Sequence, residues 1–220
     1  MTGIDAMRQI TELTKAGGAL DLGPDGSRLL LHMLRLLAQG KPITRATAEQ
    51  AAADRGIDPT TARQLLDAWT ERSDNGDILG LGITYNPTPH QMTTGGNRMW
   101  AWCALDTLIF AVALDQPIAV DSTAPGTGQT VHLRVSPDGI TDVRPDSAVV
   151  TWPARDSDQV DISSTTAIWG TFCHHSFFFP TRTDAERWAA GREDIELLTL
   201  DEGLAIAREL AAAVFLRYET

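Results

Sequence analysis

The sequence predicts an α+β fold: a helical, winged-helix-like N-terminal region followed by a mixed antiparallel sheet with helices. Three observations predict this class. Amphipathic helical segments fill the first third of the chain, short β-branched and apolar runs separated by turn residues fill the middle, and a helical pattern closes the sequence. The chain has 220 residues, of which 43% are hydrophobic, so it can bury a core.

Four helices are expected first, and each stops at a glycine or a turn. The expected ranges are 4–16, 27–39, 44–56 and 58–72 for the helices, and 78–85 and 90–93 for the two strands that follow. Asp58 is a typical N-cap and Pro59 a typical first helical residue. Because helices followed by a hairpin are typical of winged-helix modules, we expect one module at residues 1–80 and an α/β domain at residues 81–220.

The charge balance argues against nucleic acids and anionic membranes as partners. The chain carries 18 Lys and Arg against 29 Asp and Glu, a formal net charge of −11, whereas both surfaces attract basic proteins. Residues 1–80 carry nine basic and eleven acidic side chains, which favours a packing or dimerising role over a recognition helix at 60–68. No export signal and no 18-residue apolar run are visible, so we expect a cytoplasmic protein with reduced thiols.

From residue 81 onward the pattern changes to mixed strands and helices. Residues 100–114 are apolar except for Asp106 and Thr107, which predicts a helix buried on most sides. The other expected elements are strands at 118–121, 130–136, 140–144, 148–152 and 195–200, a short helix ending near 191, and a closing helix at 202–215. Thr183 and Glu186 form a candidate capping box for the short helix. Residues 154–170 are polar and are expected to be irregular.

Cys103 and Asp106 form the first group that can carry chemistry. Their i, i+3 spacing places both side chains on one face of the expected helix. Burial would raise the pKa of the carboxyl group toward a value useful for proton transfer, and a helix N-terminus would favour the Cys103 thiolate. The alternative is a core cysteine beside an aspartate that hydrogen-bonds a backbone amide.

Cys173 lies in the second group, followed by His174 and His175. A thiol beside imidazoles can be activated or can bind a metal, although a buried structural cysteine is the alternative. Combined with Cys103 and Asp106, the group allows a zinc site, a redox pair, or a soft metal ion whose bond to carbon is protonated. No CxxC or HxxxH spacing supports the first two.

Longer stretches of the sequence resemble one known family, the organomercurial (alkylmercury) lyases of bacterial mercury resistance. The residues that carry the resemblance are Trp100-Ala101-Trp102-Cys103-Ala104-Leu105-Asp106-Thr107-Leu108-Ile109-Phe110, Thr127-Gly128, Val135-Ser136-Pro137 and Thr171-Phe172-Cys173-His174-His175. The resemblance extends over essentially the whole chain. It implies cleavage of the carbon–mercury bond of R–Hg⁺ to R–H and Hg²⁺ by a catalytic domain at residues 81–220.

The resemblance also implies roles for individual residues. Cys103 and Cys173 match the two catalytic cysteines of the family and Asp106 its catalytic aspartate, and the same three would hold the Hg²⁺ product. The resemblance implies that the reaction requires no added cofactor. The implied partners are an organomercurial substrate, low-molecular-weight thiols, and a mercuric reductase that accepts Hg²⁺. We further expect Trp102, Phe172 and His174 to border the substrate pocket.

Two departures from the family pattern are visible. Some relatives carry a further cysteine near residues 122–128 and another directly after the second catalytic cysteine, whereas here the first segment has none and position 174 is histidine.

Two rival interpretations remain at this point. One is a winged-helix regulator that senses a metal through the same three residues, and the other is a structural zinc- or copper-binding domain.

Overall fold

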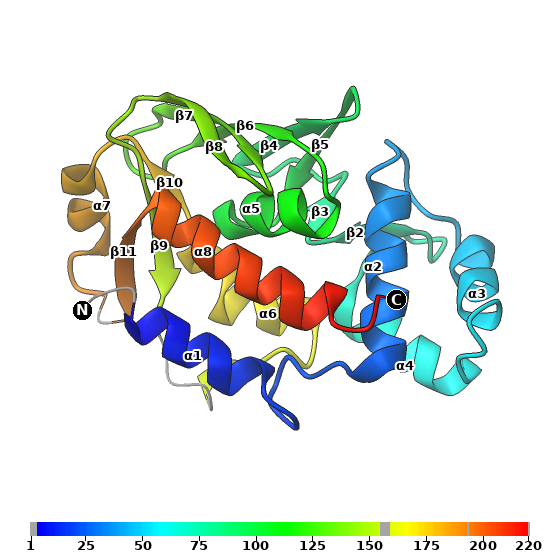
Figure 1. Ribbon diagram of the computed structural model, residues 1–220. Helices are drawn as coiled ribbons and strands as arrows, with labels where there is room; N and C mark the ends of the chain where they lie inside the picture. The colour runs from blue at the N-terminus through cyan, green and yellow to red at the C-terminus, as the bar shows by residue number, and fades with distance from the viewer. Residues whose placement is uncertain (1–3, 155–158, 193, 220) are drawn as a thin grey trace.

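The computed structural model describes residues 4–154, 159–192 and 194–219 and confirms the α+β class (Figure 1). Within these residues the strands form one eight-stranded and one three-stranded sheet, and every strand pairing is antiparallel. No helix in the described ranges is both long and apolar enough to cross a membrane.

The N-terminal region contains the four expected helices. They are α1 (Ile4–Thr14), α2 (Gly23–Leu37), α3 (Arg45–Ala53) and α4 (Pro59–Trp69). The prediction for Asp58 is confirmed, because its Oδ1 accepts hydrogen bonds from the amides of Thr60 and Thr61. The expected end of the fourth helix at residue 72 is wrong. Thr70 is extended, and the next two residues form strand β1 (Glu71–Arg72).

The single strand expected at residues 78–85 is divided into β2 (Ile78–Leu81) and β3 (Ile83–Thr84). The division falls at Gly82, whose φ is +70°. A Cβ at this position would lie 2.2 Å from Cζ of Phe110, so the ring of Phe110 occupies the space that any other side chain would need.

The large sheet contains eight strands in the order β1-β2-β3-β5-β4-β6-β7-β8. The remaining strands are β4 (His90–Thr94), β5 (Asn97–Ala101), β6 (Ile118–Thr123), β7 (Thr130–Ser136) and β8 (Gly139–Arg144). Strands from both sides of residue 80 belong to this sheet, and the division of the chain into domains at that position stays a prediction.

Helix α5 (Ala104–Ala113) is the central helix, and it begins four residues later than expected. Trp100 and Ala101 belong instead to β5, where they pair with both β3 and β4. This double pairing keeps the backbone extended up to Cys103, which has φ −144° and ψ 173° and is the N-cap of α5. An apolar run cannot by itself distinguish a buried strand from a buried helix.

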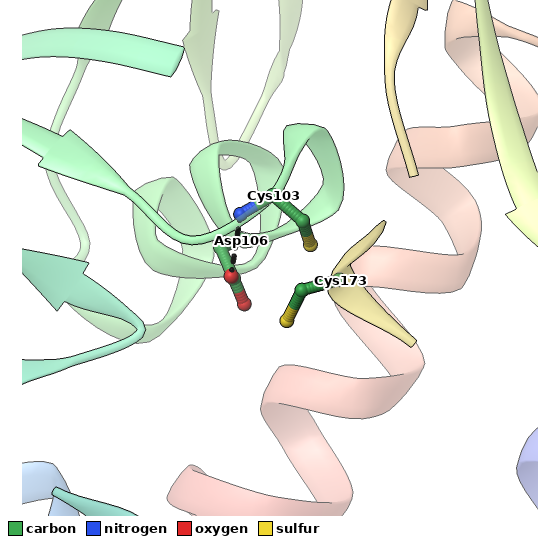
Figure 2. Close-up of side chains that lie close together, drawn as sticks. All are labelled: Cys103, Asp106 and Cys173. Carbon is green, nitrogen blue, oxygen red and sulfur yellow. Dashed lines mark hydrogen bonds between the residues drawn. The ribbon is translucent and has the colours of Figure 1, made fainter. Parts of the chain in front are cut away.

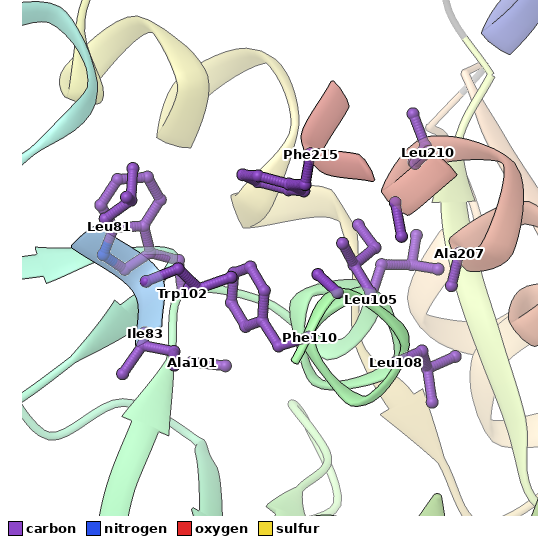
Figure 3. Packing of buried hydrophobic residues seen from close by; sticks show 14 of the residues in the cluster. Leu81, Ile83, Ala101, Trp102, Leu105, Leu108, Phe110, Ala207, Leu210 and Phe215 are labelled. Atoms are coloured by element: carbon purple, nitrogen blue, oxygen red, sulfur yellow. The ribbon is translucent and has the colours of Figure 1, made fainter. Parts of the chain in front are cut away.

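Helix α5 packs against the large sheet on one side and against α8 (Leu200–Leu210) and the π-helical turn η3 (Ala211–Leu216) on the other (Figure 1). Figure 3 shows Leu105 and Leu108 of α5 close to Ala207 and Leu210 of α8. Almost every side chain of α5 is therefore buried, as its apolar sequence predicts.

The small sheet has the order β10-β9-β11 and holds the segment that contains the second cysteine. Its strands are β9 (Val149–Pro153), β10 (Phe178–Phe179) and β11 (Ile195–Thr199). Gln9 of α1 joins this sheet to the N-terminal region, because its Oε1 accepts a 2.8 Å hydrogen bond from Nε1 of Trp152.

Two expectations for the C-terminal third are wrong. Part of the segment expected to be irregular forms α6 (Thr165–Thr171), whose N-cap Ser164 accepts a hydrogen bond from the amide of Ala167; residues 155–158 lie outside the described ranges. Helix α7 (Arg182–Ala189) is capped by Thr181 rather than Thr183, since Oγ1 of Thr181 accepts from the amide of Asp184. Thr181 has the extended backbone that an N-cap needs.

Candidate active site

Cys103 and Asp106 are joined at the start of α5 by a reciprocal cap. The amide of Cys103 donates a 3.0 Å hydrogen bond to Oδ2 of Asp106, and the amide of Asp106 bonds the Cys103 side chain. This is a capping box in which cysteine replaces the usual serine or threonine. It fixes the thiol and the carboxyl group beside each other at the positive end of the helix.

Cys173 begins the short 3-10 helix η2 (Cys173–His175), which is separated from α6 by Phe172 alone. The amide of Ser176 closes this turn by donating to the carbonyl of Cys173 over 3.3 Å. Thr151 of β9 supports it from the small sheet, because its Oγ1 donates to the carbonyl of His175 and accepts from the amide of Phe177. The turn is therefore held on one side by its own backbone and on the other by β9.

The fold brings Cys103, Asp106 and Cys173 together, although Cys173 comes 70 positions after Cys103 and 67 positions after Asp106 in the sequence. One ligand atom from each of the three lies within 4.8 Å of the other two. Figure 2 shows the three side chains projecting into the space between α5 and η2. Both cysteines are free thiols and both are buried.

Burial has the largest effect on the pKa of the Asp106 carboxyl group. Desolvation raises the pKa of Asp106 to about 6, although the hydrogen bonds from the side chain and amide of Cys103 act in the opposite direction. The carboxyl group thus titrates close to neutral pH, where it can both accept and donate a proton.

Both thiols are stabilised in their protonated form. Burial raises the pKa of Cys103, and hydrogen bonds with Cys173, the Asp106 amide and Ser176 only partly oppose this. The hydrogen bond to Cys103 is the largest cause that raises the pKa of Cys173, followed by burial. The helix N-terminus was expected to favour the thiolate form of Cys103. Desolvation, which favours the protonated thiol, therefore has the larger effect.

A cavity of about 110 Å³ opens onto this group and is lined almost wholly by apolar side chains. Asp106 and Cys173 border the cavity, and so do Trp102 and Phe172. The side chain of His174 is exposed and is not among the lining residues.

Much of the cavity wall comes from segments that the sequence did not associate with the site. Leu13 and Leu20 contribute from the N-terminal end, and Leu210, Val214 and Phe215 contribute from α8 and η3. An apolar stripe indicates only that a helix face is buried, not which site that face borders.

The donor set points to a soft metal. Thiolates select soft ions, and within the described residues no fourth cysteine, histidine or carboxylate joins the three, so the closed four-ligand zinc site is not formed. The fold and the site define an α+β protein with a buried dithiol and carboxyl centre suited to a soft metal ion.

Comparison with known proteins gives the family. The family model described as MerB, alkylmercury lyase, matches residues 83–212. An alkylmercury lyase of Streptomyces lividans is 36% identical over 214 residues, which cover 95% of this chain and 94% of that protein. An alkylmercury lyase of Staphylococcus epidermidis is 31% identical over 193 residues, covering 87% and 83%. This chain belongs to the alkylmercury lyase family.

A solved structure supports the fold. The crystal structure of the mercury-bound form of MerB2 superposes with a TM-score of 0.68 and covers 96% of this chain and 98% of that one. The sequence identity is 22%, so this likeness supports the architecture alone.

Proposed function

We propose that this chain is an organomercurial lyase that cleaves the carbon–mercury bond of R–Hg⁺ to R–H and Hg²⁺, with Cys103, Asp106 and Cys173 as its catalytic residues. The observation that carries the proposal is the approach of both thiols and the carboxyl group to within 4.8 Å in an apolar cavity. Family membership supports it independently.

The chemistry explains why these residue types are needed. An alkyl group is too basic to leave mercury as a free carbanion, so bond cleavage must be coupled to protonation of carbon. Two thiolates donate electron density to mercury and weaken its bond to carbon. The carboxyl group supplies the proton at the same place.

Capture is the first proposed step. The thiol of Cys173 borders the cavity, whereas Cys103 is not among its lining residues, so we assign the first contact to Cys173. Its sulfur bonds mercury, the external thiolate R′S⁻ leaves, and the Cys173 proton departs with it as R′SH. The organic group R then lies among the apolar side chains of the cavity.

Proton transfer is the second step. The Asp106 carboxylate accepts the proton of the Cys103 thiol, and the new thiolate bonds mercury. Asp106 then gives that proton to carbon as the carbon–mercury bond breaks, and R–H is released. The balance is one R–Hg–SR′ and two thiols going to R–H, R′SH and one Hg²⁺ held by two thiolates. A pKa of about 6 suits Asp106 to both transfers.

Product release requires thiol exchange. Mercury held by Cys103 and Cys173, with Asp106 beside it, would leave when other thiols replace the two cysteines. We therefore propose low-molecular-weight thiols, or the cysteine pair of a mercuric reductase, as acceptors. The reaction needs no added cofactor, and it needs a compartment that keeps both thiols reduced.

The test is hydrocarbon release from methylmercury or phenylmercury in excess thiol. Wild type should release methane or benzene, and Cys103→Ser, Asp106→Ala and Cys173→Ser should each abolish turnover. His132→Gln, on strand β7, is the control and should retain it. Stoichiometric Hg²⁺ binding by wild type without any hydrocarbon release would contradict the lyase assignment and favour a metal sensor.

A further inference from the structure

Ser176 lies where the two cysteine-bearing segments meet, and its side chain is completely buried. Its carbonyl accepts a 3.2 Å hydrogen bond from the amide of Ala104, and its Oγ accepts a 3.2 Å hydrogen bond from the amide of Leu105. These amides belong to the first two residues of α5, directly after Cys103. Ser176 therefore caps the helix that presents Cys103.

The same residue closes the turn that presents Cys173. Its amide donates to the carbonyl of Cys173 over 3.3 Å, so Ser176 hydrogen-bonds both segments at once. Residue 176 therefore joins η2 to the start of α5, through its backbone carbonyl and through its side chain. Two of these three hydrogen bonds are made by the backbone of residue 176, and the serine side chain adds the third, from the amide of Leu105 to its Oγ.

The side chain of Ser176 also lies beside the thiol of Cys103. Its Oγ already accepts from Leu105, which leaves the hydroxyl hydrogen free to donate, and the side chain hydrogen-bonds that of Cys103. A sulfur that becomes anionic in an apolar cavity gains most from such a donor.

We propose that Ser176 is a positioning residue for carbon–mercury cleavage, which holds the Cys103 and Cys173 segments at the spacing for one mercury ion and donates a hydrogen bond to the Cys103 sulfur. The inference rests on the proposed function. Ser176 touches neither carbon nor the transferred proton, so its effect acts through Cys103.

Thr151 offers a matched control for a purely structural role. Like Ser176 it is a completely buried hydroxyl residue, and it holds the same turn through His175 and Phe177. Among the described residues its side-chain hydrogen bonds go to this turn and not to α5. Thr151→Val therefore removes a buried hydroxyl from the turn and leaves the hydroxyl donor to Cys103 in place.

The experiment compares Ser176→Ala, Ser176→Thr and Thr151→Val by the kcat and KM of benzene release from phenylmercury. Ser176→Ala should lower kcat about 10- to 100-fold, the value of one charge-assisted hydrogen bond, with KM changed less than about threefold. Ser176→Thr keeps the hydroxyl and should restore most of kcat. Equal losses of kcat in Ser176→Ala and Thr151→Val, at equal loss of thermal stability, would overturn the proposal.

A second measurement separates this inference from the lyase assignment. Hg²⁺ bound by two thiolates gives an ultraviolet charge-transfer absorbance, which can be followed while a competing dithiol removes the ion. Ser176→Ala should release Hg²⁺ at a lower dithiol concentration than wild type or Thr151→Val, even if no variant releases benzene. Equal retention in all three would overturn the role of Ser176. Ser176→Gly replaces Ser176→Ala in both assays if the alanine variant does not fold.

Discussion

The amide of Cys103 donates a hydrogen bond to Oδ2 of Asp106 over 3.0 Å. Asp106, the proposed proton donor, is therefore hydrogen-bonded to the backbone of Cys103, a proposed mercury ligand. The bond spans one helical turn and needs no residue from elsewhere in the chain. The relative position of acid and thiol is thus fixed locally, whereas the position of Cys173 depends on tertiary structure.

Asp106→Asn is expected to abolish turnover and to stabilise the protein at neutral pH. The pKa of Asp106 is about 6 in the folded chain against 3.8 for a free side chain, so the folded state binds the proton more tightly and loses stability as pH rises through this window. Asparagine cannot ionise and can still accept from the Cys103 amide. Urea denaturation should show a gain of about 1 to 3 kcal/mol in the free energy of unfolding at pH 8.

That gain should shrink as pH falls through this window and approach zero only well below pH 3.8, where the wild-type carboxyl group is protonated in both the folded and the unfolded state. A variant that is less stable than wild type at both pH values would show that the Asp106 carboxylate is not destabilised by burial.

Cys173 should react with small alkylating reagents before Cys103. Both thiols are buried, but only Cys173 is among the residues that line the cavity. Mass spectrometry of peptides after brief treatment with iodoacetamide should find the label on Cys173, and denatured protein should carry it equally on both. Earlier labelling of Cys103 would mean that reagents reach the site by another route, and the proposed order of capture would have to be reversed.

Phe215→Leu should change the preference of the enzyme for the organic group. Phe215 lies in the cavity wall and packs edge-on against Phe110, with ring centroids 6.4 Å apart. A smaller side chain enlarges the cavity, so kcat/KM for phenylmercury should rise relative to methylmercury, at a cost of about 1 kcal/mol in stability.

Phe179→Leu is the control for this comparison. Phe179 is buried in a separate cluster around Trp188 and does not line the cavity. Phe179→Leu should lose a similar amount of stability and leave the ratio of kcat/KM for phenylmercury to that for methylmercury unchanged. An equal ratio change in both variants would exclude Phe215 as a determinant of substrate size.

Gly82→Ala should be more damaging than Gly96→Ala, although both glycines have positive φ. Alanine at 96 has no heavy atom within 4 Å of its Cβ, so it should cost only the backbone strain of about 1 to 2 kcal/mol. At 82 the new Cβ collides with the ring of Phe110, which lines the cavity. Thermal denaturation and turnover should both fall further in Gly82→Ala, and equal effects would contradict this packing argument.

Local signals predicted many of the elements. Asp58 and Pro59 specified the start of α4 because capping depends on residues adjacent in sequence. The start of α5 was misplaced because Trp100 and Ala101 are held extended by β3 and β4, partners that no local pattern reveals. The break at Gly82 likewise depends on Phe110, which is 28 residues away in the sequence.

The candidate site was predicted more completely than its surroundings. Cys103, Asp106 and Cys173 were singled out by residue type and by resemblance, and the structure places them together. Ser176 was missed although it follows Cys173 by three residues, since a serine carries no signal until its partners in α5 are known. Trp102 and Phe172 were expected at the pocket and border the cavity, whereas the rest of its wall was missed because it is assembled from both ends of the described chain.

The wall contributed by Leu210, Val214 and Phe215 has a consequence during protein synthesis. The ribosome synthesises Cys103 and Cys173 before this segment. In the nascent chain, both thiols are therefore present before the C-terminal part of the cavity wall. Oxidants and free mercury can reach that pair until α8 and η3 dock against α5. Between the synthesis of the second cysteine and the docking of the last helix, the cavity that borders the site therefore lacks this part of its wall.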